Sequence, residues 1–276
     1  MKSKETKILY LSTKSSSGEL LNGDMKSDVL YDLKNYLMYE DDKTVEYITI
    51  SVPSCVLVNS NYIINQYNNT LTINSTTYTF PVGNYIAKTF VDIFSSIVSG
   101  YTLAINTITS RFTITKTAGG SFTILGSSPI SYVMGFSETI TATSSYTFSR
   151  VCNFLPNATY QLCVANGAMY NGLVLAVDGR VSYSNILCSI PNDSRLNTQI
   201  VYQNQNNEFR LNSLSCDFLN IQIRDNNGNL VDFNGIATFF SLQINIYRRQ
   251  LKIVGQFSDV LNNAISSAFD AQSANE

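Results

Sequence analysis

The feature that most constrains the fold is a long succession of short strand-like segments in the second half of the chain. Between residues 145 and 247, runs rich in β-branched and aromatic residues follow one another, many alternating apolar with polar side chains. Turn-forming residues separate several of them, notably Asp178-Gly179 and Asn226-Asn227-Gly228. Many short strands at regular spacing predict an all-β antiparallel sandwich, and we expect a single jelly roll. The runs are Ser145–Phe148, Thr159–Ala165, Leu173–Val177, Val181–Leu187, Gln199–Gln203, Glu208–Leu214, Phe218–Arg224, Leu230–Phe233 and Thr238–Tyr247.

Composition supports an ordered β-protein. The 276 residues are 44% hydrophobic but only 14% charged, against about 25% in an average globular protein. Asn, Ser and Thr fill the difference, next to many β-branched and aromatic residues, which is unlike a disordered chain. A formal net charge of −2 argues against a protein whose main task is to bind nucleic acid.

An earlier strand is predicted over Val45–Val58, and Pro53 interrupts it. Proline has no N–H to donate to a neighbouring strand, so Pro53 predicts either an edge position or a β-bulge.

Residues 60–136 differ in pattern and predict a compact ββαβββ module inserted between two early strands. Its helix is expected over Asn84–Ser99, with Asn84 as the N-cap and apolar residues following at helical spacing. We therefore assign the jelly-roll domain to residues 25–250, with its strands in 25–58 and 138–249. The strands expected around the helix are Thr70–Asn74, Thr77–Phe80, Thr102–Asn106, Arg111–Thr117 and Ser121–Leu125.

Both termini are expected to lie outside this domain. Residues 1–24 are polar and locally basic, which predicts a flexible N-terminal arm whose deletion leaves the domain folded. Its lysines suggest a tether to a neighbouring protein or loose contact with phosphate, and a frayed terminus is an equal alternative. Residues 251–276 place apolar side chains on one helical stripe and predict a short amphipathic helix.

The chain lacks residues that several common kinds of protein chemistry require. The chain has no His, the usual general base and metal ligand, and no Trp, the best platform for stacking sugars. The five cysteines are odd in number and form no CxxC pair, so we expect free thiols buried in a core. We expect no enzyme activity, no catalytic residues, no cofactor and no metal. The cysteines are Cys55, Cys152, Cys163, Cys188 and Cys216.

Free thiols indicate a reducing compartment. The first seven residues lack the apolar segment of a signal peptide, and no apolar run approaches 18 residues, so neither secretion nor a membrane span is expected.

Three local motifs are candidates for a metal, binding or catalytic site. Asp225–Asn229 superficially suggests a calcium loop, but Leu230 stands where the template needs glycine, and a tight hairpin turn explains these residues better. Asp178-Gly179-Arg180 is explained by a turn in the same way. Asp217, Asp225 and Asp232 lie near strand ends, where two of them would need to converge for glycosidase chemistry, and nothing else singles out a pair.

Seven segments, taken together and in order, resemble the penton, or minor capsid, protein of virophages, polinton-like viruses and some giant DNA viruses. The resemblance covers about residues 45–247 and is most specific at Phe80–Tyr85 and in the final strand–turn–strand block. The segments are Ile50–Val58, Asn59–Asn65, Phe80–Tyr85, Met134–Phe136, Asn185–Pro191, Leu219–Gly228 and Val231–Gly235.

The resemblance implies a single jelly roll that forms a homopentamer at each fivefold vertex of an icosahedral capsid. It implies the major capsid protein of neighbouring capsomers as partner, a place in the virion, and assembly in the host cytoplasm. The alternatives are another minor capsid protein, or a receptor- or carbohydrate-binding jelly roll on the virion surface. A hydrolase on a β-sandwich is a third class, which would need two converging carboxylates in a cleft.

Overall fold

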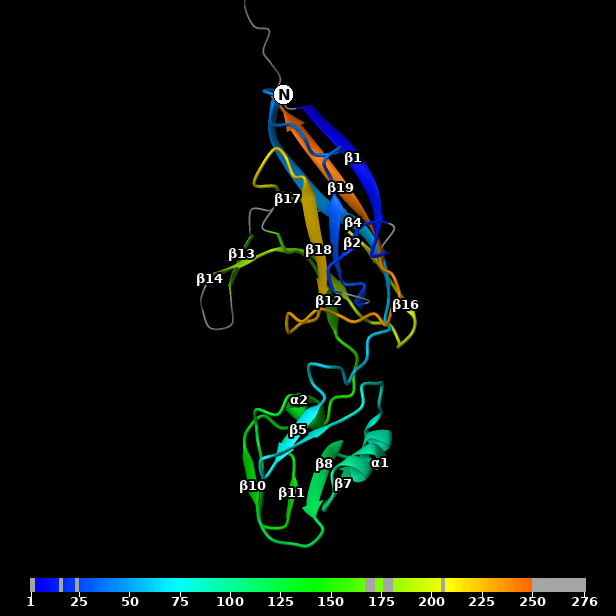
Figure 1. Ribbon diagram of the computed structural model, residues 1–276, viewed down its shortest axis with the longest axis vertical. Coiled ribbons are helices and arrows are strands. Elements are labelled where there is room, and N and C mark those ends of the chain that lie inside the picture. The colour runs from blue at the N-terminus through cyan, green and yellow to red at the C-terminus, as the bar shows by residue number, and fades with distance from the viewer. Residues whose placement is uncertain are drawn as a thin grey trace, which may run out of the picture.

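Two bodies of unequal make-up lie end to end along the long axis of the molecule (Figure 1). The larger contains both ends of the described chain, and the smaller is built from one continuous insertion. The structure is a computed structural model that describes residues 3–14, 17–22, 25–166, 172–175, 181–204 and 207–249.

The larger body is a sandwich of two antiparallel sheets. The first sheet has the order β1-β19-β4-β16, with β17 also paired to β4, and the second has the order β15-β12-β18-β3-β2. The first consists of β1 (Ser3–Ser12), β19 (Phe239–Arg248), β4 (Val45–Val58), β16 (Gln199–Gln203) and β17 (Phe209–Arg210). The second consists of β15 (Ile186–Pro191), β12 (Thr159–Val164), β18 (Phe218–Arg224), β3 (Asp28–Asp32) and β2 (Glu19–Leu20).

The path of the chain between these sheets identifies the jelly roll. The chain runs from β1 to β3, back to β4, across to β12 and β15, back to β16, across to β18 and back to β19. The first and last of these eight strands therefore lie side by side, each paired with the other over ten residues. Eight strands in two sheets with this Greek-key order are a jelly roll, so the predicted fold class is confirmed.

The jelly-roll core lies between the two sheets and follows from the period-two alternation of strands. In β19, Phe240, Leu242, Ile244 and Ile246 face inward and are at most 3% exposed. The register of β19 on β4 shifts between Ser241 and Gln243, next to Pro53. The predicted bulge at Pro53 is confirmed, and it lies in a central strand.

The smaller body is inserted between β4 and β12. It has two small sheets, ordered β10-β9-β5-β6 and β11-β8-β7. Its core is separate from that of the jelly roll and is rich in phenylalanine. The elements are β5 (Thr70–Ile73), β6 (Thr76–Thr79), α1 (Ala87–Ile97), β7 (Tyr101–Asn106), β8 (Arg111–Lys116), β9 (Phe122–Ile124), α2 (Ser131–Met134), β10 (Ile140–Ala142) and β11 (Ser145–Thr147).

Three sequence-based boundaries were wrong. Residues 1–24 are not a flexible arm where the structure describes them, because β1 is a full strand of the jelly roll. The module does not end at residue 136, because β11 pairs with β8 and side chains as far along as Phe154 pack on its core. Helix α1 begins at Ala87, since the side chain of Asn84 instead accepts a hydrogen bond from the Ile63 N–H at 2.9 Å.

Two further predictions concern segments that the structure describes only in part or not at all. The strands predicted around Asp178-Gly179 appear as the hairpin β13 (Gly172–Leu175) and β14 (Val181–Ser184), while the turn itself and the tail 251–276 lie outside the described residues. Among the helices that the structure describes, none is long and apolar enough to cross a bilayer.

Candidate functional site

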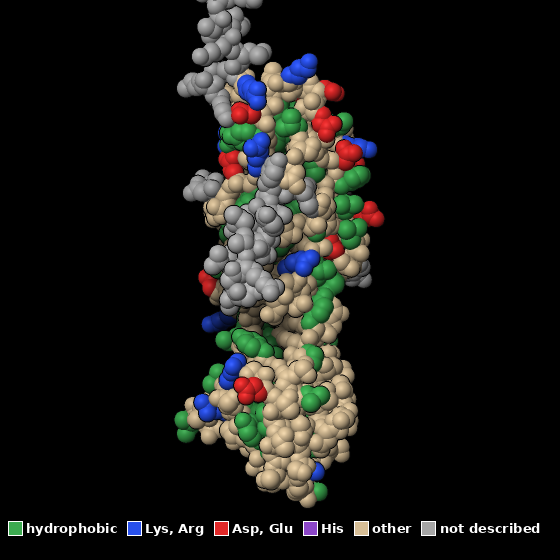
Figure 2. Space-filling model, turned by 90° about the vertical axis from the view of Figure 1, so that its left-hand side faces the viewer, with side chains coloured by type: hydrophobic (Ala, Val, Ile, Leu, Met, Phe, Trp, Pro, Cys, Tyr) green, Lys and Arg blue, Asp and Glu red, His purple; other side chains and the backbone are tan. Residues whose placement is uncertain are grey.

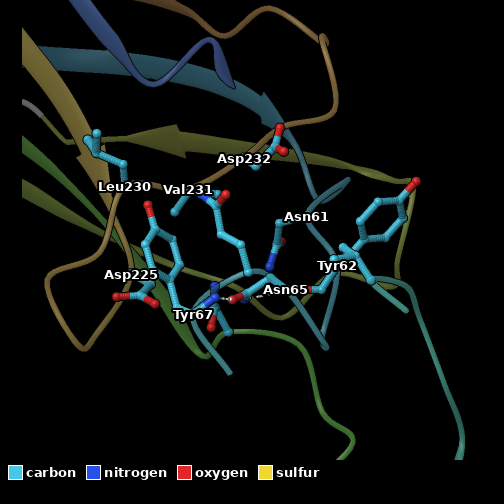
Figure 3. Close-up of a pocket in the computed structure, with 11 residues that line it drawn as sticks. Asn61, Tyr62, Asn65, Tyr67, Asp225, Leu230, Val231 and Asp232 are labelled. Carbon is cyan, nitrogen blue, oxygen red and sulfur yellow. Dashed lines mark hydrogen bonds between the residues drawn. The ribbon is translucent and has the colours of Figure 1, made fainter. Parts of the chain in front are cut away.

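A small cleft of about 80 Å³ opens where the jelly roll meets the inserted module (Figure 3). Its walls come from four parts of the chain: the segment that leaves β4, the segment between β6 and α1, the segment that returns to β12, and the loop that follows β18. The lining residues are Asn61, Tyr62, Asn65, Gln66, Tyr67, Val82, Asn157, Asp225, Leu230, Val231 and Asp232.

A buried hydrogen-bond network fixes the junction beside this cleft. The hydroxyl of Tyr160, a fully buried residue of β12, shares its single proton between the side-chain oxygen of Asn59, at 2.7 Å, and that of Asn61. The side-chain amide of Asn59 also donates an N–H to the backbone carbonyl of Ser194 at 3.0 Å. Ser60 donates to the carbonyl of Phe233 at 2.7 Å. The first residues after β4 are therefore tied to the sandwich before the module begins.

Substitution of Tyr160 by Phe should destabilise the protein by about 1–3 kcal/mol. The ring would still pack, but the oxygens of Asn59, which is fully buried, and of Asn61, which is 5% exposed, would lose their donor. Urea unfolding measures the loss. The matched control is Tyr132→Phe, at a position 70% exposed, which should change the free energy of unfolding by less than about 0.5 kcal/mol. Equal stability of the two variants would contradict this role.

Asp225 serves the turn after β18 rather than a metal site. One carboxylate oxygen accepts the backbone N–H groups of Asn227 at 2.8 Å and Asn229 at 2.9 Å, and the other accepts the Asn229 side chain at 3.2 Å. Gly228 adopts φ +83°, a conformation that favours glycine. The residues of the suggested calcium loop are thus explained by their own backbone.

The three acidic residues weighed for catalysis do not form one group. Asp217 and Asp225 flank opposite ends of β18, whose seven residues span about 23 Å. Asp225 and Asp232 do line the same cleft, and one oxygen of Asp232 accepts the Asn234 backbone N–H at 2.8 Å. Within the described part of the chain, no three His, Cys, Asp or Glu residues are grouped to hold a metal ion.

The N-terminal lysines lie on the jelly roll instead of extending from it. Lys4 forms an ion pair with Glu208 at 2.9 Å, Lys7 donates to the Tyr39 hydroxyl, and Lys14 lies 5.2 Å from the centre of the Phe239 ring. These contacts place the described lysines on the jelly roll itself and not on a free arm. Lys2 is outside the described residues.

The Glu208 carboxylate is held ionised by its neighbours. Burial raises its pKa, but hydrogen bonds from Thr49, Lys4 and Tyr247 outweigh burial and lower the pKa from 4.5 to about 2. A depressed carboxyl pKa gives stability that is present above pH 4.5 and is lost as the pH falls through about 2.

Wild-type protein should therefore be more stable than Glu208→Gln at pH 7, and the difference should shrink between about pH 4.5 and pH 2. Thermal unfolding of both proteins across this range tests the expectation. Glu138→Gln, at an exposed position in the module, is the control and should show no such convergence. A difference that stays constant with pH would contradict the charge-based explanation.

An exposed apolar patch lies on the outer face of the first sheet. Val56 pairs with both Phe239 and Val201, which places the three side chains in one row across β19, β4 and β16. Phe239 is 47% exposed, Val201 62%, and Tyr10 on the neighbouring β1 is 84% exposed. We call Tyr10, Val56, Val201 and Phe239 the outer apolar patch.

Charge is unevenly distributed over the surface. On the face seen in Figure 2, most charged side chains lie over the jelly roll, and the module is largely uncharged. Residues 60–158 contain only Lys88, Asp92, Arg111, Lys116, Glu138 and Arg150 as charged residues. Such a surface is suited to neutral partners more than to nucleic acid.

All five cysteines are free thiols. Burial raises the pKa of Cys163 to about 11 and that of Cys188 to about 12, and it also raises the pKa of Cys55. At neutral pH these three thiols are protonated, so they act as core side chains and not as nucleophiles.

Comparison with known proteins gives similarity at the level of solved structures. No protein-family model and no curated protein matches the chain. The chain is similar to the mavirus penton protein in its crystal structure, with 9% identity and a TM-score of 0.45, over 88% of this chain and 99% of that one. It is also similar to a chain in the cryo-EM structure of the Sputnik virophage, with 9% identity and a TM-score of 0.37, over 89% and 97% of the respective chains.

Proposed function

We propose that this chain is a structural protein of an icosahedral viral capsid, a homopentameric penton that closes the fivefold vertices. The fold supports the proposal, because two-sheet jelly rolls are a common architecture of viral capsid domains. Lectins and cupins share that architecture, so the fold alone does not decide among them.

The observation that carries the proposal is where the penton-like sequence segments lie. Four of these segments, from two distant regions of the sequence (59–85 and 219–235), meet at the junction cleft through Asn61, Val82, Asp225 and Asp232. A fifth contains Gly135, which adopts φ +90° and lies so close to the Arg150 carbonyl that a Cβ would stand 2.5 Å from its oxygen. The segments that carry the resemblance therefore include residues that join the module to the jelly roll and a glycine that the module's own packing requires.

The outer apolar patch is the surface we assign to contact between subunits. A closed ring requires one side of each subunit to meet a different side of the next. Apolar side chains surrounded by polar ones, as around Phe239 and Val201, are the composition expected at such a contact. In this proposal the ring contacts the major capsid protein of neighbouring capsomers and is assembled in the host cytoplasm.

Native mass spectrometry of the purified protein tests the stoichiometry. We expect a complex of five chains that dissociates when Val201 and Phe239 are both replaced by Ser. Ile108→Ser, at a module position 92% exposed, is the control and should leave the complex intact. A stable trimer, or a monomer at every concentration, would contradict the penton assignment.

A further inference from the structure

The junction cleft contains polar groups that the fold does not use. The Asn61 side chain is 5% exposed, and one end of its amide is satisfied by Tyr160. Figure 3 shows the other end pointing inward among the lining residues. No described residue bonds to that end, which borders the open cleft. An amide group in this position is free to form hydrogen bonds with water or with a ligand.

Other lining groups also have no partner in the described part of the chain, and those of Gln66, Tyr67 and Asp232 are exposed. Among the described residues, nothing forms a hydrogen bond with the side chains of Gln66 and Asn157 or with the Tyr67 hydroxyl. Asp232 uses one carboxylate oxygen for the Asn234 N–H and leaves the second without a partner. The cleft therefore presents amide donors, amide acceptors and a carboxylate acceptor together.

Two tyrosine rings border these polar groups. Tyr62 is 37% exposed and Tyr67 is 41% exposed, and Figure 3 places them at different ends of the lining. Each ring offers an apolar face next to hydrogen-bonding groups.

The charge of the cleft limits the ligand further. Its lining contains Asp225 and Asp232 but no Lys or Arg. A phosphate, sulfate or carboxylate ligand would meet like charge without a counter-ion, which disfavours anions. The volume of the cleft is about 80 Å³, which is far below the volume of a pocket for a drug-sized molecule, about 300–1,000 Å³. It is enough for one edge of a sugar ring.

We propose that the junction cleft binds a terminal neutral hexose of a glycan. Each sugar hydroxyl both donates and accepts, so hydroxyls match the open amide end of Asn61, the Gln66 amide and the free oxygen of Asp232. The apolar face of the sugar ring lies against Tyr67. Gln66, Tyr67 and Asn157 lie outside the penton-like segments, whereas Asn61 and Asp232 lie within them. The sugar-binding test uses the purified chain, so its outcome is separate from that of the stoichiometry test.

Saturation-transfer NMR on the purified full-length chain tests the site. The probes are the methyl glycosides of glucose, galactose and mannose, and N-acetylglucosamine, each at about 10 mM, a concentration suited to weak sites. We expect at least one to bind, and methyl glucuronide, which carries a carboxylate, to bind more weakly than methyl glucoside. Absence of binding by all four neutral probes would overturn the proposal.

Two variants test whether the sugar probes bind in the junction cleft. Tyr67→Ala removes the ring but keeps the backbone N–H that Asn65 accepts, and Asp232→Asn keeps an oxygen for the Asn234 N–H. Each should weaken binding about tenfold or more. Gln199→Ala, an exposed position on β16, is the control and should bind as wild type does. Binding that survives both variants, or that is lost on adding EDTA, would overturn direct recognition by these side chains.

Discussion

Deletion of residues 1–13 is expected to abolish cooperative folding of the jelly roll. The deletion removes β1, which pairs with β19 over ten residues, together with Leu9 and Leu11, which pack on the core. It also leaves the buried Tyr31 hydroxyl without the Ser12 carbonyl, and the Thr238 N–H without Thr13. Each such group costs about 1–3 kcal/mol, and a domain has only about 5–15 kcal/mol of stability in total.

Circular dichroism and thermal unfolding measure this loss. The matched control is Tyr10→Ser, which alters an 84% exposed side chain of the same strand and should keep the fold. A truncated protein that unfolds at the wild-type temperature would show that β1 is dispensable, as expected of an arm.

The second large effect is expected from Phe90→Ala in the module. Phe90 is fully buried, and its ring centre lies 5.0 Å from that of Phe80, 5.3 Å from that of Phe154 and 6.0 Å from that of Phe112. Truncation of a buried phenylalanine costs about 3–5 kcal/mol, since it removes apolar contacts and leaves a cavity.

Because the two cores are separate, we expect this variant to unfold its module while the jelly roll stays folded. Hydrogen exchange followed by mass spectrometry should show loss of protection in residues 64–154 only. Ile108→Ala, at a 92% exposed position, should leave protection unchanged. Simultaneous loss of protection in both bodies would contradict the separation of the cores.

Strand periodicity predicted most of the fold, and the failures have specific causes. The first strand was missed because two of its inward positions carry charge, Glu5 and Lys7. Arg248 pairs with Glu5 at 3.1 Å and Tyr39 accepts from Lys7, so these charges are satisfied at the edge of the sheet. A pattern based only on apolar alternation cannot anticipate such partners, which come from distant parts of the chain.

The module boundary failed for a different reason. The segment at β11 is a short run of strand-forming residues, like the jelly-roll strands that follow it, and only its pairing with β8 assigns it to the module. Local sequence does not encode which sheet a short strand joins.

The junction cleft was only partly foreseeable. Asp225 and Asp232 were recognised as residues at strand ends, and Asn157 only as the start of a chance glycosylation-type triplet, but Gln66 and Tyr67 carried no motif. The cleft exists because the chain leaves the sandwich after β4 and returns before β12, which brings distant segments together. Topology, and not local pattern, creates the site.

The central claim, the proposed place of this chain in a viral capsid, is tested most directly by a cryo-EM reconstruction of virus particles from its source. The account predicts five copies around each fivefold axis, each recognisable as a jelly roll whose first and last strands, β1 and β19, lie side by side, with one inserted module per copy. Density for this chain as a trimeric capsomer on the faces of the particle, or its absence from the vertices, would contradict the account.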